Sequence, residues 1–134
     1  MQRGEDGETG KGKKNFELEV KWKPPTNGFI VLNTYATLDE KQEKARWGIV
    51  TRNEHGEVVC TWAGNESKDI KAEIEEADAI RTALTKTKQE GWRKVIVQSD
   101  CKKVVDKIAE SCTLDPVMGT IVEDILSFIQ NFSK

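Results

Sequence analysis

The side chains that could carry chemistry in this 134-residue chain are carboxylates. A single histidine excludes histidine-based metal clusters and most catalytic triads, and three cysteines without C-x-x-C spacing argue against a zinc site. Asp100 is the strongest candidate for a functional residue, because it follows the apolar run KVIVQS and should therefore lie at the end of a buried strand. Ligands gather at that end of the strands in open α/β sheets. The alternative is that Asp100 caps the helix that follows.

Glu76 is the second candidate carboxylate. It lies three and four residues before Ala79 and Ile80, so on a helix it would flank the packed face rather than point straight to solvent. Glu73, one turn earlier, is a competing choice and lies even closer to the apolar stripe. Each could also be an ordinary acid that favours the positive end of a helix dipole.

The elements that must position these acids follow from the apolar pattern. A long helix is expected over 69–90, where apolar residues recur every three or four positions. Gly91 should cap its C-terminus. The short apolar run 94–99 is typical of a buried parallel strand. Two further helices are expected, one over 101–111 and one after Asp115, an N-cap that precedes a proline.

The preceding part of the chain is predicted to form three strands. Phe29–Thr37 is a β-branched and aromatic run, and 47–64 has the pattern of a hairpin with a turn at Gly56. His55 lies in that turn, where an exposed side chain is expected. The charged stretch Leu38–Ala45 is predicted to be a loop or a short helical turn. The order of elements predicts an α/β fold: a three-stranded antiparallel meander, a parallel fourth strand, and helices packed on the sheet.

One domain is expected. Residues 1–20 are rich in glycine and mixed charge and should form a flexible tail, whereas 21–134 should form the domain, with order beginning near Trp22. No apolar run approaches the roughly 20 residues of a membrane span, so no membrane partner is expected. The odd cysteine count and the absence of a signal-peptide pattern favour the cytoplasm or the nucleus over secretion.

The motifs, taken in order, resemble the ribonuclease H-like domains of plant and retroelement proteins (reverse transcriptase-like). That family has a WxPP motif, then LNxDGA on the first strand, GGVIRDxxGE in a hairpin, AExxALxxGL on the long helix, and VxVESDS at the end of the fourth strand. This chain has WKPP, FIVLNT, WGIVTRNEHGEVV, EEADAIRTAL and VIVQSDCKKVVDKI. The resemblance covers about Trp22 to Phe132.

The resemblance implies hydrolysis of the RNA strand of RNA/DNA hybrids with two divalent cations, Mg²⁺ or Mn²⁺. Two hard cations about 4 Å apart must be neutralised by clustered carboxylates, so the family uses four acids. By this correspondence the helix acid is Glu76 and the acid after the fourth strand is Asp100. These two are the catalytic and metal-binding positions that the resemblance assigns.

Two of the four acids are missing. Tyr35 stands where LNxDGA has its aspartate, and a phenol with an ordinary pKa of about 10 is neutral at pH 7. The fourth acid belongs to a final helix after a fifth strand, and we expect both elements to be absent. A glycine-rich stretch after the first strand is also replaced, by LDEKQEKA. These departures predict that nuclease activity has been lost.

Substrate contact could survive this loss. The formal net charge of −2 excludes a uniformly basic nucleic-acid-binding surface but permits a local patch. Between residues 81 and 107, eight basic residues outnumber three acids. Phosphate contacts dominate non-specific nucleic-acid affinity. An ordinary solvated surface is the alternative. The candidate phosphate-binding residues in this stretch are Arg93, Lys94, Lys102 and Lys103.

Three hypotheses follow. The leading one is a nuclease-deficient ribonuclease H-like domain that binds nucleic acid. The second is an active metal-dependent nuclease that rebuilds its site from Glu73, Glu76 and Asp100, with help from Asp39 or Glu40. The third is a protein-interaction module or homodimer that uses the strand 94–99 as a bare sheet edge.

Overall fold

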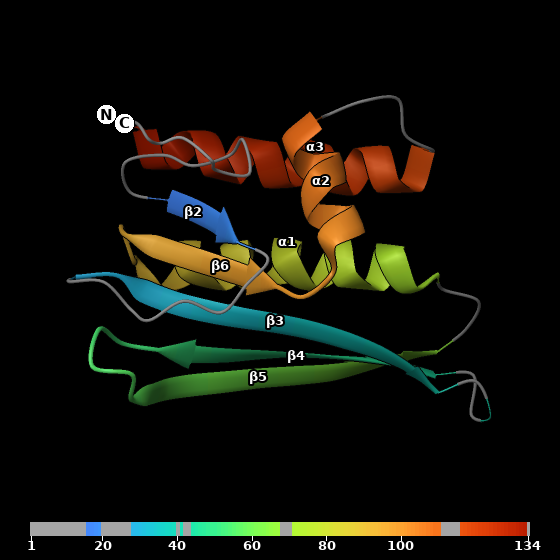
Figure 1. Ribbon diagram of the computed structural model, residues 1–134, viewed down its shortest axis with the longest axis horizontal. Coiled ribbons are helices and arrows are strands. Elements are labelled where there is room, and N and C mark those ends of the chain that lie inside the picture. Colours follow the sequence, from blue (N-terminus) through green and yellow to red (C-terminus); the bar gives the residue numbers. More distant parts are fainter. Residues whose placement is uncertain are drawn as a thin grey trace.

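The computed structural model describes residues 16–19, 28–39, 41, 44–67, 71–110 and 116–133, which form a five-stranded sheet and three helices. The strands follow the spatial order β2-β6-β3-β4-β5 (Figure 1). The elements in chain order are β2 (Phe16–Glu19), β3 (Ile30–Asp39), β4 (Lys44–Arg52), β5 (Val58–Ser67), α1 (Ala72–Glu90), β6 (Val95–Ser99), α2 (Lys102–Glu110), α3 (Pro116–Gln130) and a 3₁₀ turn (Asn131–Ser133).

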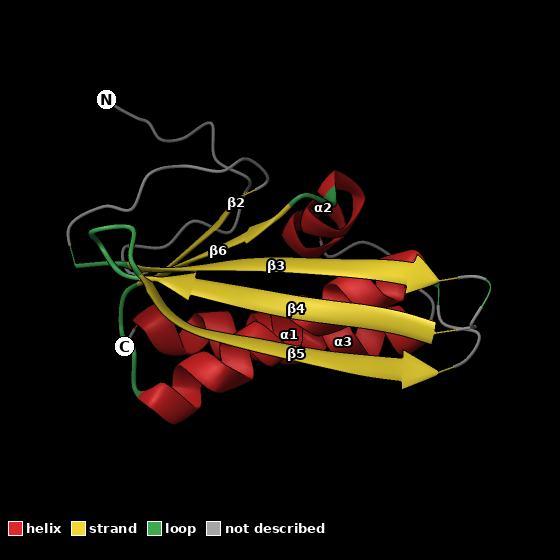
Figure 2. Ribbon diagram, turned by 90° about the horizontal axis from the view of Figure 1, so that it is seen from below, coloured by secondary structure: helices red, strands yellow, loops and turns green. Residues whose placement is uncertain are grey.

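The helices α1 and α3 lie on one face of the sheet, as the view from the other side shows (Figure 2). Helix α1 packs on β3, β4 and β6, and α3 packs on α1 and α2. The buried core lies between these layers. It combines Leu32 and Ile49 from the sheet with Ile80 and Leu84 from α1 and Ile125 from α3. No helix in the described ranges is long and apolar enough to cross a membrane.

The predicted meander and the parallel strand beside it are confirmed. Strand β4 pairs antiparallel with β3 and with β5, and β6 pairs parallel with β3. All five residues of β6 are buried. Gly91 ends α1 with a φ of 76°, a left-handed conformation that glycine adopts without strain. His55 is exposed in the β4–β5 turn, as expected. Pro116 begins α3, while the predicted capping residue before it lies outside the described residues.

The prediction of a loop or helical turn over Leu38–Ala45 is wrong at both ends. Leu38 and Asp39 continue β3, and Lys44 and Ala45 begin β4, with Leu38 paired to Ala45. Continuing the antiparallel ladder satisfies more backbone N–H and C=O groups, and it buries Ala45 completely. The charged side chains of this stretch concealed the strand pattern.

The sheet contains a fifth strand, contrary to the expected absence, and it comes from the N-terminal side. Strand β2 pairs parallel with β6 from Phe16↔Val95 to Glu19↔Gln98. Phe16 and Leu18 are 0% and 1% exposed, and the Phe16 ring stacks on Phe132 at 5.3 Å between centroids. The expected boundary of a tail at residue 20 is therefore too late, and β6 is not a bare edge. The expected start of order near Trp22 lies outside the described residues.

Candidate carboxylate site

The candidate site lies where β6 ends beside β3. The two strands pair from Ile30↔Val95 to Thr34↔Ser99, and the chain then leaves the sheet at Asp100. Beyond Thr34, β3 continues its ladder with β4 alone. The backbone N–H of Ala36, on this unpaired side, faces the carboxylate of Glu76 from the first turns of α1. The end of a parallel strand and the start of a helix thus bring the two predicted acids together.

Partial burial and nearby negative charge raise the pKa of Glu76 from its ordinary 4.5 to about 7. The largest cause is partial burial of the carboxyl, and the second is the negative charge of Asp100. Glu75 adds a smaller repulsion, whereas the N–H of Ala36 acts in the opposite direction. Oε1 of Glu76 is buried without a hydrogen-bond partner in the described part of the chain. At this position the carboxyl group is suited to hold a proton or to face a cation.

Metal binding at this site depends on the number of side chains that can donate to a cation. Within the described ranges, no group of three or more His, Cys, Asp or Glu residues is arranged to hold a metal ion. The unpartnered oxygen of Glu76 and the exposed carboxylate of Asp100 could face one cation. Two carboxylates cannot neutralise two adjacent dications, so the described residues do not fit the two-metal site that the resemblance implies.

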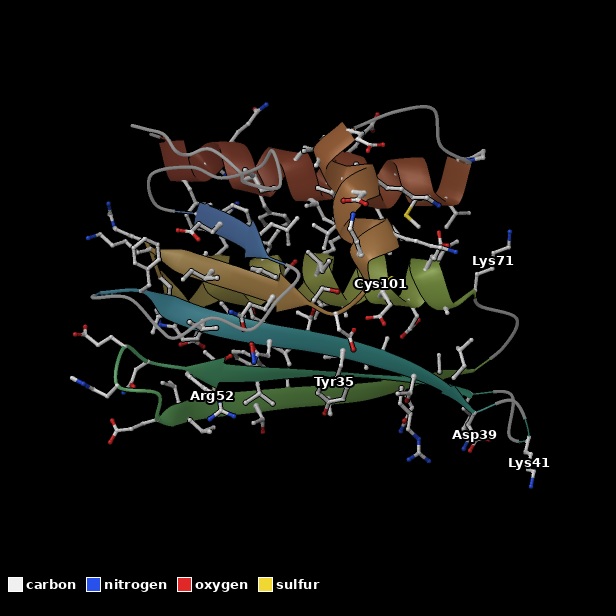
Figure 3. The ribbon with its side chains drawn as sticks, viewed as in Figure 1. Tyr35, Asp39, Lys41, Arg52, Lys71 and Cys101 are labelled. Atoms are coloured by element: carbon white, nitrogen blue, oxygen red, sulfur yellow. The ribbon has the colours of Figure 1, made fainter. Side chains whose placement is uncertain are left out.

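Tyr35 does not replace the missing acid. Leu32 of β3 faces the core, so Tyr35, three residues later in a strand of period two, faces the opposite side of the sheet. Its ring lies across β4, because a Cβ built on Gly48 would come within 2.1 Å of Tyr35 Cζ. The phenol is therefore directed over Gly48, and the side chain is 46% exposed (Figure 3).

The acids of the rebuilt-site hypothesis do not join Glu76 and Asp100. Glu73 is hydrogen-bonded to Lys107 of α2, and this bond lowers the pKa of Glu73. Asp39 lies at the far end of β3, where its Oδ1 accepts a hydrogen bond from the backbone N–H of Lys41 at 3.1 Å (Figure 3). The other proposed helper, Glu40, lies outside the described residues.

Sequence reasoning missed two side chains near the pair. Glu75 is 1% exposed and adds to the repulsion on Glu76. Glu75, Ala79 and Ala83 follow one another at intervals of four residues, so on a helix they lie on one face. This spacing could have predicted from the sequence that Glu75 is buried. The Cys101 thiol has a raised pKa, chiefly because of burial, and the charge of Glu76 contributes.

The four candidate phosphate-binding residues lie at opposite ends of β6. Arg93 and Lys94 precede the strand, and the Nζ of Lys94 lies 5.9 Å from the centroid of the Phe29 ring. Lys102 and Lys103 follow the strand in the first turn of α2, on the side of the carboxylate pair. Lys102 forms an ion pair of 2.7 Å with Asp106 of α2. The structure therefore divides the predicted basic patch into two pairs.

Comparison with known proteins locates this arrangement among described folds. Residues 33–134 match the family model described as reverse transcriptase-like. A search of curated proteins gives no match. The ribonuclease H1 of the halophilic archaeon Halobacterium salinarum NRC-1 superposes with a TM-score of 0.70 at 16% identity, over 78% of this chain and 79% of that chain.

Two further solved structures are similar. The N-terminal RNase H domain of Rv2228c from Mycobacterium tuberculosis, solved as a fusion with maltose-binding protein, has a TM-score of 0.68 at 14% identity, over 78% of this chain and 76% of that chain. LC11-RNase H1 in complex with an RNA/DNA hybrid has a TM-score of 0.67 at 16% identity, over 78% of each chain. At these identities the likeness shows the fold, which is that of ribonuclease H.

Proposed function

Because the chain belongs to the reverse transcriptase-like family, whose model matches residues 33–134, we propose that it is a ribonuclease H-like nucleic-acid-binding domain whose nuclease activity is lost. The observation that carries the proposal is the carboxylate count. Glu76 and Asp100 are brought together, but among the described residues no third acid joins them in a group arranged to hold a metal ion, and Tyr35 stands at the position of the family's first-strand aspartate.

Electrostatics supports the loss of a two-metal reaction. Even with both carboxyl groups ionised, the pair Glu76–Asp100 supplies only two negative charges. Two dications carry four positive charges and would repel each other strongly at about 4 Å. The phenol of Tyr35, which lies over Gly48, adds no anionic oxygen to the pair.

A nucleic-acid ligand is supported by fold and by charge. LC11-RNase H1, which shares the fold, was solved in complex with an RNA/DNA hybrid. Exposed basic residues flank the carboxylate pair, with Lys102 and Lys103 at the start of α2. Such side chains neutralise phosphates without any need for catalysis. We propose that this binding persists after the loss of cleavage.

The decisive experiment is cleavage of a labelled RNA/DNA hybrid with MgCl₂ and, separately, with MnCl₂. We expect no turnover above a protein-free control, together with salt-dependent binding of the uncleaved hybrid. Asp100→Asn serves as the matched variant. If the unmodified protein cleaves the RNA strand and Asp100→Asn does not, the loss of activity is disproved.

An active nuclease is the second candidate, and one observation favours it. The unpartnered Oε1 of Glu76 beside Asp100 could bind a single Mg²⁺ ion. Titration with MgCl₂ followed by NMR tests this, because bound metal would shift the backbone amide signals around both residues. Unchanged signals at millimolar Mg²⁺ would remove this candidate.

Of two other expectations, one loses its premise and one remains a proposal. The protein-interaction hypothesis loses its premise, because β2 pairs with the edge of β6 on which it depended. Location in the cytoplasm or the nucleus is supported by the free thiols Cys60 and Cys101. Fluorescence microscopy of the tagged chain would test the location.

A further inference from the structure

A second candidate site lies on the face of the sheet that α1 and α3 leave uncovered. We call it the open face, and define it by Tyr35, Arg46, Gly48, Arg52 and Ala63 on β3, β4 and β5. In the view of Figure 2 these strands stand in front of both helices. Tyr35, Thr37 and the residues paired with them, Gly48 and Arg46, project to this side, because strand side chains alternate. The open face is therefore distinct from the core that α1 seals.

The aromatic ring of Tyr35 lies over β4 at the centre of the open face. Tyr35 pairs with Gly48, which in turn pairs with Ala63 on β5. The ring can extend over β4 only because residue 48 has no Cβ, since a Cβ there would lie 2.1 Å from Tyr35 Cζ and 2.2 Å from Oη. The ring therefore lies over Gly48 of β4, and Tyr35 is 46% exposed, so part of it is open to solvent.

Two arginines flank this ring along β4. Arg46 is two residues before Gly48 and Arg52 is four residues after it, which on a strand corresponds to about 7 Å and about 13 Å. Arg46 is exposed, and no ion pair joins it to another described residue. Arg52 donates one hydrogen bond from Nη1 to the backbone oxygen of Gly56 at 3.4 Å. The other N–H groups of its side chain donate no hydrogen bond to another residue in the described part of the chain.

The charge of the open face is complementary to a polyanion. Among the described residues of β3, β4 and β5 that project to this face, the basic residues Lys44, Arg46 and Arg52 outnumber the single acid, Asp39, which lies at the hairpin end. The chain as a whole has a formal net charge of −2, so this local excess is not a general property of the surface. Proteins that bind single-stranded nucleic acids use such an aromatic ring between cations: a base stacks on the ring and the cations contact the phosphates.

We propose that the open face binds single-stranded nucleic acid, with a base stacked on Tyr35 and phosphates on Arg46 and Arg52. The inference rests on the proposed nucleic-acid-binding function and names its ligand class. A duplex presents base edges and backbone to a protein surface, whereas an unpaired strand offers the π-face of a base to the ring. The position where the family keeps a metal-binding acid thus carries a stacking surface in this chain.

The test measures binding of a fluorescein-labelled 12-nucleotide oligo-U to the full chain by anisotropy at several NaCl concentrations. Tyr35→Ala should weaken binding about 10-fold and leave the slope of log affinity against log salt unchanged. Tyr35→Phe should bind as the unmodified protein does, whereas Tyr35→Leu should resemble Tyr35→Ala. Circular dichroism confirms that each variant is folded.

The arginines have a different signature. Arg46→Ala should reduce the magnitude of the salt slope by about 0.7, the value for one phosphate contact on a single strand. Lys88→Ala is the matched control, because Lys88 is also exposed but lies in the last turn of α1, on the side of the sheet away from the open face. It should leave both the affinity and the slope unchanged.

A direct contact provides a second readout. Tyr35 is the only tyrosine of the chain. Photo-cross-linking of an oligonucleotide that contains 5-iodouridine should therefore yield an adduct on the peptide that contains Tyr35, and mass spectrometry should locate this adduct. The adduct should diminish in Arg46→Ala and persist in Lys88→Ala.

The outcomes separate this inference from the function beneath it. If the oligonucleotide or a hybrid binds but Tyr35→Ala and Arg46→Ala match the unmodified protein, the open face is refuted while nucleic-acid binding stands. If Lys88→Ala weakens binding as much as Arg46→Ala does, the inference also fails. If oligo-U, hybrid and duplex all fail to bind at 20 mM NaCl, the proposed function falls and the inference with it.

Discussion

Replacing Glu76 with glutamine should stabilise the protein at alkaline pH and have little effect at acidic pH. The folded-state pKa of Glu76 is about 7, above its ordinary 4.5, so the folded state binds this proton more tightly than the unfolded state does. The resulting stability is fully present below pH 4.5 and is lost as the pH rises through 7. Glutamine keeps the shape and an acceptor oxygen but cannot ionise, so the Glu76→Gln variant escapes this loss.

The magnitude follows from the size of the pKa rise. A rise from 4.5 to about 7 corresponds to at most about 3.4 kcal/mol, at about 1.36 kcal/mol for each pKa unit. Glu76 is only partly buried, so solvent screening reduces this upper limit, and we expect about 1–2 kcal/mol. With a urea dependence of roughly 1–3 kcal/mol per M, the unfolding midpoint should rise by roughly 0.3–2 M at pH 8.

The assay is urea denaturation of both proteins, followed by tryptophan fluorescence, at pH 4.5, 6, 7 and 8. The difference in the free energy of unfolding should grow across this series and level off above pH 8. Glu73→Gln provides the matched control on the same helix. Because Lys107 lowers the pKa of Glu73, the loss of this acid should destabilise the protein at pH 8, the opposite direction.

A pH-independent difference between Glu76→Gln and the unmodified protein would refute this reasoning. So would a variant that is less stable at pH 8 than at pH 4.5 relative to the unmodified protein, because the carboxylate would then be favoured in its charged form. Either result would show that burial and the charge of Asp100 do not raise the pKa of Glu76.

Three further predictions follow from the same structure. Asp100→Asn should lower the pKa of Glu76 and shift the pH dependence of stability toward pH 4.5, with a smaller stabilisation at pH 8 than Glu76→Gln; an unchanged profile would contradict the coupling. Phe16→Ala should cost roughly 3–5 kcal/mol in urea denaturation, because the ring is fully buried at the sheet edge; a loss below 1 kcal/mol would mean that β2 does not pair with β6. Gly48→Ala should cost roughly 1–3 kcal/mol, because its Cβ displaces the ring of Tyr35, and most of this cost should vanish in combination with Tyr35→Ala; simple additivity of the two substitutions would show that the ring lies elsewhere.

The elements with a strong local pattern could be predicted from the sequence. The helix period around Ile80 and Leu84, and the hairpin with its turn at Gly56, depend on residues close together in the chain. Asp100 and Glu76 were identified as a pair through a resemblance of motifs, and the structure brings them together. Their catalytic and metal-binding roles stay a prediction.

Strand β2 shows why the rest could not be predicted. Phe16 and Leu18 alternate with glutamates, a pattern too short to distinguish a strand from a charged tail. Their burial depends on Val95 and Val97, to which they are paired in space but not in sequence. The same holds for Glu73, whose availability was decided by Lys107 from another helix.

The sequence by itself determined which chemical groups exist and which short segments become helix or strand, because both depend on neighbouring residues. Only the tertiary structure decided where those groups point. It turned Tyr35 over Gly48, separated Arg93 from Lys103 by the length of β6, and raised the pKa of Glu76 by partly burying it and placing it beside Asp100. Strand pairing and burial act between distant parts of the chain, and the direction and charge of a side chain depend on both.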